Sequence, residues 1–146
     1  MLPVRIMSAS LTLEYEFSHH DDFGWLVARL ETPDFCGRNG MFVQWQDLVE
    51  YGEALARYPI EAADPVINEW GFGTVEDYNC ITRIVIGPSG PTGGLLCDVS
   101  LSDYHDPEYS CRSQFTTDCP AVGQFRQQLA AMMRKEGRHA VLAAVN

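Results

Sequence analysis

Basic residues are scarce in this sequence. Its 146 residues include 20 aspartates and glutamates but only 10 lysines and arginines, which gives a formal net charge of −10 at pH 7. The imbalance lies in residues 1–122, where 19 acidic residues face six arginines, whereas residues 123–146 hold four basic residues and one acidic residue. So negative a surface repels phosphate backbones, and we therefore expect no nucleic-acid partner. It would attract a basic protein and speed the encounter with it, although solubility alone also accounts for such a charge.

Long apolar runs are also missing. No stretch approaches the ~18 consecutive apolar residues that a membrane-spanning helix needs, so we expect no membrane partner. The first ten residues, MLPVRIMSAS, contain one arginine and no long apolar segment, which is unlike a secretory signal peptide. A hydrophobic fraction of 46% in 146 residues is enough for a core. We therefore expect one α+β domain over residues 1–146 and a cytoplasmic location.

The sequence contains no closely spaced cysteine pair. Its five cysteines are odd in number and widely scattered, at Cys36, Cys80, Cys97, Cys111 and Cys119. This pattern favours reduced thiols in a reducing compartment over a disulfide framework. The glycine-rich segment 87–94, GPSGPTGG, lacks the Lys-Ser/Thr ending of a phosphate-binding loop and precedes a strand rather than a helix. Since a GxSxG nucleophile motif is absent as well, we expect no catalytic residue and no cofactor.

Apolar and polar residues alternate with period two along several stretches, which predicts β-strands. The clearest examples are residues 11–17, LTLEYEF, and residues 95–101, LLCDVSL. Further strands are predicted at residues 24–31, 41–45, 80–86 and 109–116, with residues 32–40 as a loop and residues 66–72 as either a strand or a loop.

Two segments instead show apolar residues at helical spacing. They predict helices at about residues 46–58 and 120–136, the first ended by Pro59 and the second capped by Asp118. The order of elements contains no β-α-β alternation, so short connections favour antiparallel pairing. The predicted fold is α+β, an antiparallel meander sheet of five to seven strands with both helices packed on one face.

Acidic turns with aromatic residues among them are the main candidate for a functional surface. A hairpin of strands 80–86 and 95–101 would put the acidic segments 76–77 and 103–108 at one end, opposite the glycine-rich loop. Aromatic side chains anchor protein interfaces, and charges steer partners to them. Solubility, with aromatics closing the ends of a sheet, explains the same pattern. The candidate partner-binding residues are Asp21, Asp22, Glu76, Asp77, Tyr78, Asp103, Tyr104, Asp106 and Glu108, and the neighbouring aromatics are Phe23, Phe35, Trp70 and Phe72.

A histidine-containing turn at residues 19–22, HHDD, supports an alternative hypothesis. Imidazoles and carboxylates ligate divalent metals, and a histidine can act as a general base near neutral pH. Four adjacent residues cannot all converge on one ion, however, so we predict no metal site. The alternative is a small enzyme or a metal- or ligand-binding domain that uses His19, His20, His105 or Cys36.

Four segments follow one another in an order that resembles a known group of proteins. They are GWLVARLET, FCGRNGMFVQWQDLVEYGEALARY, GGLLCDVSL and VGQFRQQLAAMM. In this order, residues 10–135 resemble the small immunity-type proteins of bacterial polymorphic toxin systems, namely the WapI-like immunity group and related uncharacterised bacterial domains. The resemblance implies an α+β fold and a non-enzymatic role, in which the protein binds a cognate toxin, often a basic nuclease, and blocks it. It transfers no site residues, because none of the shared features is catalytic.

The C-terminal helix and the apolar residues 141–145 support a third hypothesis, a structural or oligomerisation module. A homodimer is therefore also among the expected assemblies.

Overall fold

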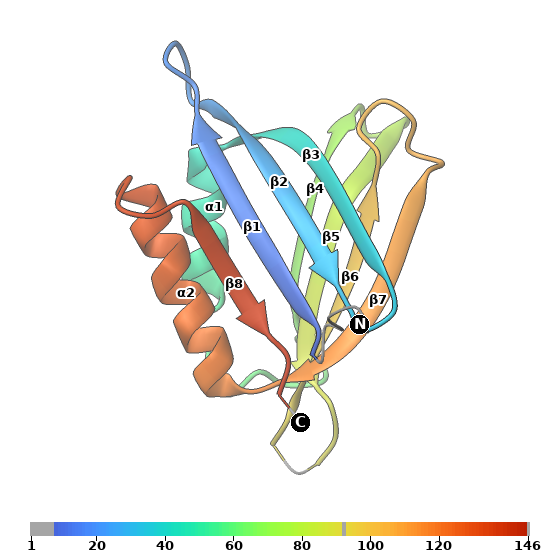
Figure 1. Ribbon diagram of the computed structural model, residues 1–146, viewed down its shortest axis with the longest axis vertical. Helices are drawn as coiled ribbons and strands as arrows, with labels where there is room; N and C mark the ends of the chain where they lie inside the picture. Colours follow the sequence, from blue (N-terminus) through green and yellow to red (C-terminus); the bar gives the residue numbers. More distant parts are fainter. Residues whose placement is uncertain (1–7, 92, 146) are drawn as a thin grey trace, which may run out of the picture.

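The computed structural model describes residues 8–91 and 93–145, which form eight strands and two helices (Figure 1). The strands make two antiparallel sheets of four strands each, with the orders β3-β2-β1-β8 and β4-β5-β6-β7. The strands are β1 (Ser10–Phe17), β2 (Phe23–Glu31), β3 (Cys36–Gln44), β4 (Val66–Gly73), β5 (Tyr78–Pro88), β6 (Leu95–Ser102), β7 (Ser110–Thr117) and β8 (His139–Ala143). The helices are α1 (Trp45–Ala54) and α2 (Cys119–Met133).

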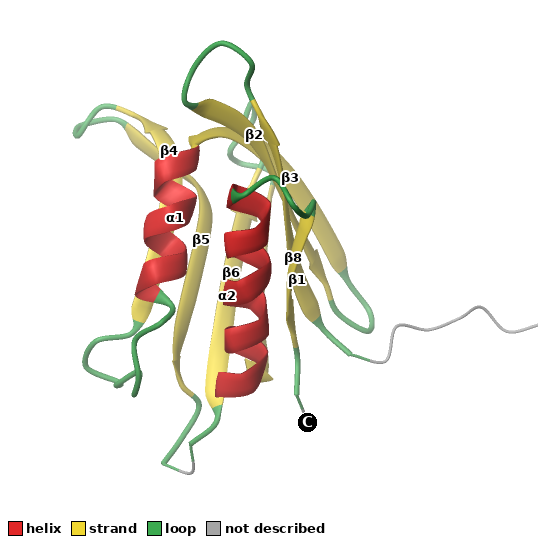
Figure 2. Cartoon of the chain, turned by 90° about the vertical axis from the view of Figure 1, so that its left-hand side faces the viewer, coloured by secondary structure: helices red, strands yellow, loops and turns green. Residues whose placement is uncertain are grey.

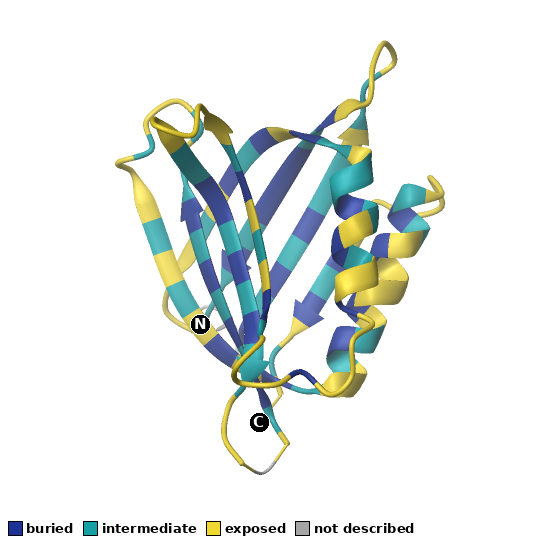
Figure 3. Cartoon of the chain, turned by 180° about the vertical axis from the view of Figure 1, so that it is seen from behind, coloured by how far each residue is buried: buried dark blue, intermediate teal, exposed yellow. Residues whose placement is uncertain are grey.

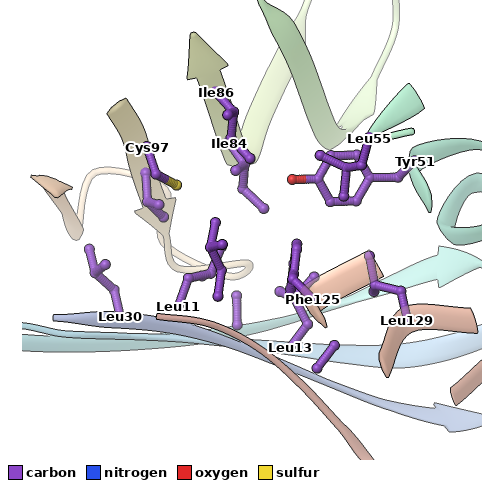
Figure 4. Close-up of a cluster of buried hydrophobic side chains, with 14 of the residues drawn as sticks. Leu11, Leu13, Leu30, Tyr51, Leu55, Ile84, Ile86, Cys97, Phe125 and Leu129 are labelled. Carbon is purple, nitrogen blue, oxygen red and sulfur yellow. The ribbon is translucent and has the colours of Figure 1, made fainter. Parts of the chain in front are cut away.

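The two sheets and the two helices enclose a common core. Figure 2 shows that the sheets diverge from each other and that both helices lie along the open side between them. Leu11 and Leu13 of the first sheet, Ile84 of the second sheet and Phe125 of α2 are fully buried and point into the same interior (Figure 4). Each such side chain contributes about 1.5–3 kcal/mol through burial, so this core is the main source of stability.

This arrangement corrects the predicted sheet. The α+β class and the antiparallel pairing are confirmed, but the strands form two sheets rather than one meander of five to seven strands. The chain passes from β3 through α1 to β4, which begins the second sheet, and returns at its C-terminus to place β8 against β1. The helices therefore lie between two sheets, not on one face of one sheet. Alternation shows which face of a strand is buried, but it does not show which strand lies beside it.

The third strand is longer than predicted, because residues 36–40 extend β3 instead of forming a loop. Its glycines serve close packing. A Cβ on Gly40 would lie 2.5 Å from Cζ2 of Trp25, and a Cβ on Gly37 would overlap with Sγ of Cys111. Glycine in a strand marks such close approaches as well as turns, so the sequence pattern was misleading here. Residues 66–73, which were ambiguous, form β4.

Both helices end earlier than predicted. Helix α1 ends at Ala54 rather than near residue 58, and α2 ends at Met133 rather than near residue 136. Asp118 caps α2 as predicted, since its Oδ1 accepts a hydrogen bond from the N–H of Ala121 at 2.9 Å. Among the described residues, no helix has the length and apolar character to cross a membrane.

The apolar C-terminal residues pack within the chain. Strand β8 pairs with β1 so that Leu142 lies opposite Leu11 and Ala140 opposite Leu13, and all four side chains are fully buried. At the last residue of β8 the chain meets the second sheet, where Oγ1 of Thr117 on β7 donates a hydrogen bond to the carbonyl of Ala143 at 2.9 Å. The C-terminal strand therefore completes the first sheet by pairing with β1 of the same chain, and its end is hydrogen-bonded to the second sheet.

Candidate protein-binding surface

Three acidic turns lie at one end of the molecule. They are the β1–β2 turn at residues 18–22, the β4–β5 turn at residues 74–77 and the β6–β7 turn at residues 103–109. Figure 1 shows all three opposite the glycine-rich β5–β6 loop, as antiparallel strands require, and Figure 3 shows that they are exposed. The β1–β2 turn stands above the first sheet, and the other two stand above the second. We call this part of the molecule the acidic end.

Four aromatic side chains at the acidic end connect the two sheets. Trp25 on β2 and Phe42 on β3 have ring centroids 4.8 Å apart, and Phe72 on β4 lies 5.0 Å from Tyr104 in the β6–β7 turn. Tyr104 also lies 6.3 Å from both Trp25 and Phe42. All these distances fall in the ~4.5–7 Å range of favourable aromatic pairs. We call these four residues the aromatic cluster, and Tyr104 is at its centre because it contacts the other three.

The aromatic cluster is partly open to solvent. Phe42 is 54% exposed and Phe72 is 36% exposed. A groove of about 190 Å³ between the edge strands β3 and β4 is lined by Phe42 together with Phe23 and Tyr78, and Glu69 lines it as well. Partly exposed aromatic side chains beside a groove are typical of sites that bind other proteins.

Two glycines give these aromatic rings their positions. The indole of Trp25 lies across Gly40, and the ring of Tyr78 lies across Gly71, where a Cβ would be 2.6 Å from the Tyr78 hydroxyl. Gly71 also follows a register shift in the pairing of β4 with β5. Flat rings can rest on the backbone only where no side chain intervenes, so the glycines present the aromatic faces at the surface.

A buried amide fixes the turn that carries Tyr104. Nδ2 of Asn39 on β3 lies 3.0 Å from the carbonyl oxygen of Ser102, two residues before Tyr104. The same nitrogen lies 3.0 Å from Oγ1 of Thr82 and 3.2 Å from the carbonyl oxygen of Ile81. One side chain of the first sheet thus holds two strands of the second sheet and the start of the β6–β7 turn.

The predicted acidic residues divide into two groups. Some shape the turns: Oδ2 of Asp103 accepts hydrogen bonds from the N–H groups of His105 and Asp106 at 3.1 and 2.8 Å. In the β1–β2 turn, Oδ1 of Asp21 accepts a hydrogen bond from the backbone N–H of Phe23. Oδ2 of Asp22 accepts one from the side-chain amide of Gln46. The remaining carboxylates are exposed at the acidic end, at Glu76, Asp77, Asp106 and Glu108.

The negative charge of the acidic end acts on a nearby phenol. Burial, the largest cause, and the carboxylates of Asp47, Asp21 and Asp22 together raise the pKa of Tyr15 to about 12. The Tyr15 hydroxyl donates a hydrogen bond to the carbonyl of Val43 at 2.7 Å. The field of these carboxylates therefore disfavours additional negative charge at this end.

Sequence reasoning missed half of the aromatic cluster. For Trp25 and Phe42 the sequence predicts only strands, because period-two alternation does not reveal that an outward-facing aromatic meets a turn of another sheet. Conversely, Trp70 is 5% exposed and packs in the core against Tyr51, and Phe35 lies 79% exposed in the β2–β3 turn at the opposite end. Gly40 is a signal for the position of Trp25, because it lies two residues along β3 from Phe42, the residue paired with Trp25. This relationship can be seen only once the register of β2 and β3 is known.

The residues of the alternative hypothesis are dispersed. His19 and His20 lie in the β1–β2 turn, His105 packs edge-on against Tyr104, and Cys36 begins β3. Within residues 8–91 and 93–145, no group of three or more His, Cys, Asp or Glu side chains is arranged to hold a metal ion. Burial raises the pKa of Cys97 to about 12, which keeps that thiol protonated and unreactive near neutral pH.

One of these histidines does border a cleft. His19 lines a cleft of about 600 Å³ beside the end of β1, together with Lys135, Arg138 and His139. Nε2 of His139 lies 3.0 Å from Oε1 of Glu14. The cleft thus combines carboxylates, imidazoles and cations. The sequence pattern gives no signal for His139, because it lies in an apolar C-terminal strand.

The acidic end combines a rigid aromatic cluster, an adjoining groove and exposed carboxylates. Aromatic side chains with charged groups around them are also found at the interfaces of protein complexes. The chain matches no known protein-family model, and no curated protein matches it.

Proposed function

We propose that the protein is a non-enzymatic acidic binding protein, immunity-like in its role, that captures and neutralises a basic protein partner through the acidic end. The observation that carries this proposal is the half-exposed aromatic cluster centred on Tyr104 and bordered by the carboxylates of the surrounding turns. Such a combination provides both an anchor and a charge pattern, and neither depends on an enzymatic residue.

The aromatic rings would supply most of the affinity. Phe42 and Tyr78 are each about half exposed, so covering them removes apolar area from water. Their faces can also accept arginine or lysine side chains through cation–π contacts, which contribute ~0.5–2 kcal/mol each. The exposed carboxylates Glu76, Asp77, Asp106 and Glu108 would accelerate encounter, and their effect would fall as salt is added.

The test is binding to a basic protein encoded beside the gene for this chain. The two proteins are co-expressed, co-purified and then titrated calorimetrically at low and high salt. Phe42→Ala and Tyr104→Ala are expected to weaken binding by tenfold or more, since an anchoring aromatic contributes ~2 kcal/mol. Phe35→Ala is the matched control, because Phe35 is an exposed phenylalanine in a turn at the opposite end.

The results discriminate clearly. Retained affinity in the Phe35 variant with loss in the Phe42 and Tyr104 variants supports the acidic end as the interface. Equal affinity in all three variants, or a neighbour that fails to bind at low salt, would reject it.

The cleft beside His19 keeps the ligand-binding alternative in consideration. Its mixed charges suit a small molecule that carries both a cationic and an anionic group. A thermal-shift screen of zwitterionic metabolites and divalent metals, repeated with His139→Ala, tests this alternative. A stabilising compound whose effect disappears in the variant would support it, whereas an unchanged melting temperature throughout would remove it.

A further inference from the structure

We propose that two copies of this chain associate through the groove between α1 and α2, with α1 of each copy lying on α2 of the other. This inference is independent of the proposed function, because it concerns the helices and not the acidic end. It assigns an occupant to an apolar groove on the surface of the described residues.

The groove between the two helices is lined mainly by apolar residues. It has a volume of about 510 Å³ and lies where the two helices run side by side on the open side of the sheets (Figure 2). One side of the groove is lined by Val49 and Gly52 on α1 and by Ala56 just after it. The other side is lined by Leu129, Ala130 and Met133 on α2. Gly52 leaves space, since a Cβ added there would meet no atom within 4 Å. Small residues in such a position let another helix approach closely.

The two sides of the groove carry opposite charge. Glu53 on α1 and Arg126 on α2 both line it, and both are exposed. No ion pair joins these two residues in the part of the chain that the structure describes. Glu50 is a second exposed acid on α1. Arg134, just after α2, also lines the groove and forms an ion pair with Glu136 at 3.0 Å, so Arg126 is the cation that remains for a partner. An exposed cation on α2 therefore lies beside exposed acids on α1.

A second copy matches this pattern without any further assumption. The helices run in opposite directions, because α1 begins at the acidic end and α2 ends there. A two-fold axis parallel to both helices places α1 of one copy over α2 of the other, so Glu53 of each copy faces Arg126 of its partner. The four helices then form an antiparallel bundle whose apolar centre is the pair of grooves. A partner helix of uniform charge would meet repulsion at one side of the groove, which favours self-association.

The experiment is light scattering on the full chain across the micromolar concentration range, at physiological ionic strength so that the net charge of each copy is screened. The expected mass is twice the 16.4 kDa of one chain. Glu53→Arg and Arg126→Glu should each shift the particle to the monomer mass, because they place like charges opposite each other. The double variant with both changes should restore the dimer, because it exchanges the charges and keeps the pairs.

A second pair of variants tests the apolar part of the groove. Gly52→Gln should fill the groove and give a monomer while the fold is retained, as judged by circular dichroism. Ala54→Gln, an exposed change on the same helix, should leave the dimer intact. A wild-type protein that stays monomeric over the whole concentration range overturns the proposal, as does a dimer whose mass no groove variant changes. Loss of partner binding in the Phe42 variant with an unchanged mass would separate this surface from the acidic end.

Discussion

Nδ2 of Asn39 on β3 donates a hydrogen bond to Oγ1 of Thr82 on β5, across 3.0 Å between the two sheets. Both residues are buried, Asn39 at 7% exposure and Thr82 at 0%. The same amide also reaches the carbonyl of Ser102 at the start of the turn that carries Tyr104. Inter-sheet packing and the position of the aromatic cluster therefore depend on one side chain.

We expect Asn39→Ala to lower the free energy of unfolding by about 1–3 kcal/mol. The reason is that the carbonyl oxygens of Ile81 and Ser102 would remain buried without this donor. Thr82→Val should cost less, about 0.5–1.5 kcal/mol, because the Asn39 amide keeps both carbonyl partners. Urea denaturation of the two variants and the wild type measures the order. A larger loss for Thr82→Val would mean that Asn39 is not the residue that joins the sheets.

Two glycine-to-alanine changes should have opposite effects on stability. Gly40→Ala places a Cβ 2.5 Å from the Trp25 indole, so the ring must move and the aromatic cluster is disturbed. Within one chain, the Cβ of Gly52→Ala meets no atom within 4 Å. At concentrations below the dimer range, this change should therefore stabilise α1 by about 0.5–1 kcal/mol through helix propensity. Thermal unfolding gives the melting temperatures of the two variants, and near-UV circular dichroism shows whether the packing of their aromatic side chains has changed. A Gly40→Ala protein with the wild-type melting temperature and aromatic spectrum would contradict the close packing of Trp25.

Local features of the fold could be predicted from the sequence. The alternation in residues 95–101 identified β6 and its buried face, and Asp118 identified the start of α2. These signals succeed because the pattern of burial and the capping hydrogen bond are both determined within a few residues of chain.

Long-range arrangement could not be predicted in the same way. The division into two sheets depends on where α1 redirects the chain and on β8 returning to β1, contacts that join residues far apart in sequence. The aromatic cluster was half visible, as Phe72 and Tyr104, because those residues lie near acidic turns. Trp25 and Phe42 joined it only through the approach of the β6–β7 turn to the edge of the first sheet.

The C-terminal strand should be essential for stability. Leu142 is fully buried opposite Leu11, so Leu142→Ala should cost about 2–5 kcal/mol. Val141, the adjacent residue on the other face of β8, is partly exposed, and Val141→Ala is the matched control with a smaller expected loss. The urea unfolding midpoints of the two variants and the wild type measure these losses. If the two variants lost the same stability, β8 would not contribute its inward face to the core.

Stability at alkaline pH should depend on Tyr15. Burial, and to a lesser extent the carboxylate of Asp47, raises the pKa of this phenol from its ordinary value of 10.0 to about 12. A group with a raised folded-state pKa contributes fully to stability below its unfolded-state pKa, and the contribution is lost as the pH rises towards the folded-state value. For Tyr15 the loss should therefore develop between about pH 10 and pH 12.

Tyr15→Phe isolates this effect, because other tyrosines titrate equally in both proteins. At pH 7 the variant should be less stable by about 0.5–1.5 kcal/mol, since it loses the hydrogen bond to the carbonyl of Val43. Above pH 10 the wild type loses the Tyr15 contribution and the variant does not, so the difference between them should shrink. Urea denaturation at neutral pH and just above pH 10 measures it, with Tyr58→Phe as the control because Tyr58 is 80% exposed. A difference that stayed constant with pH would show that Tyr15 ionises no less readily in the folded protein than in the unfolded chain.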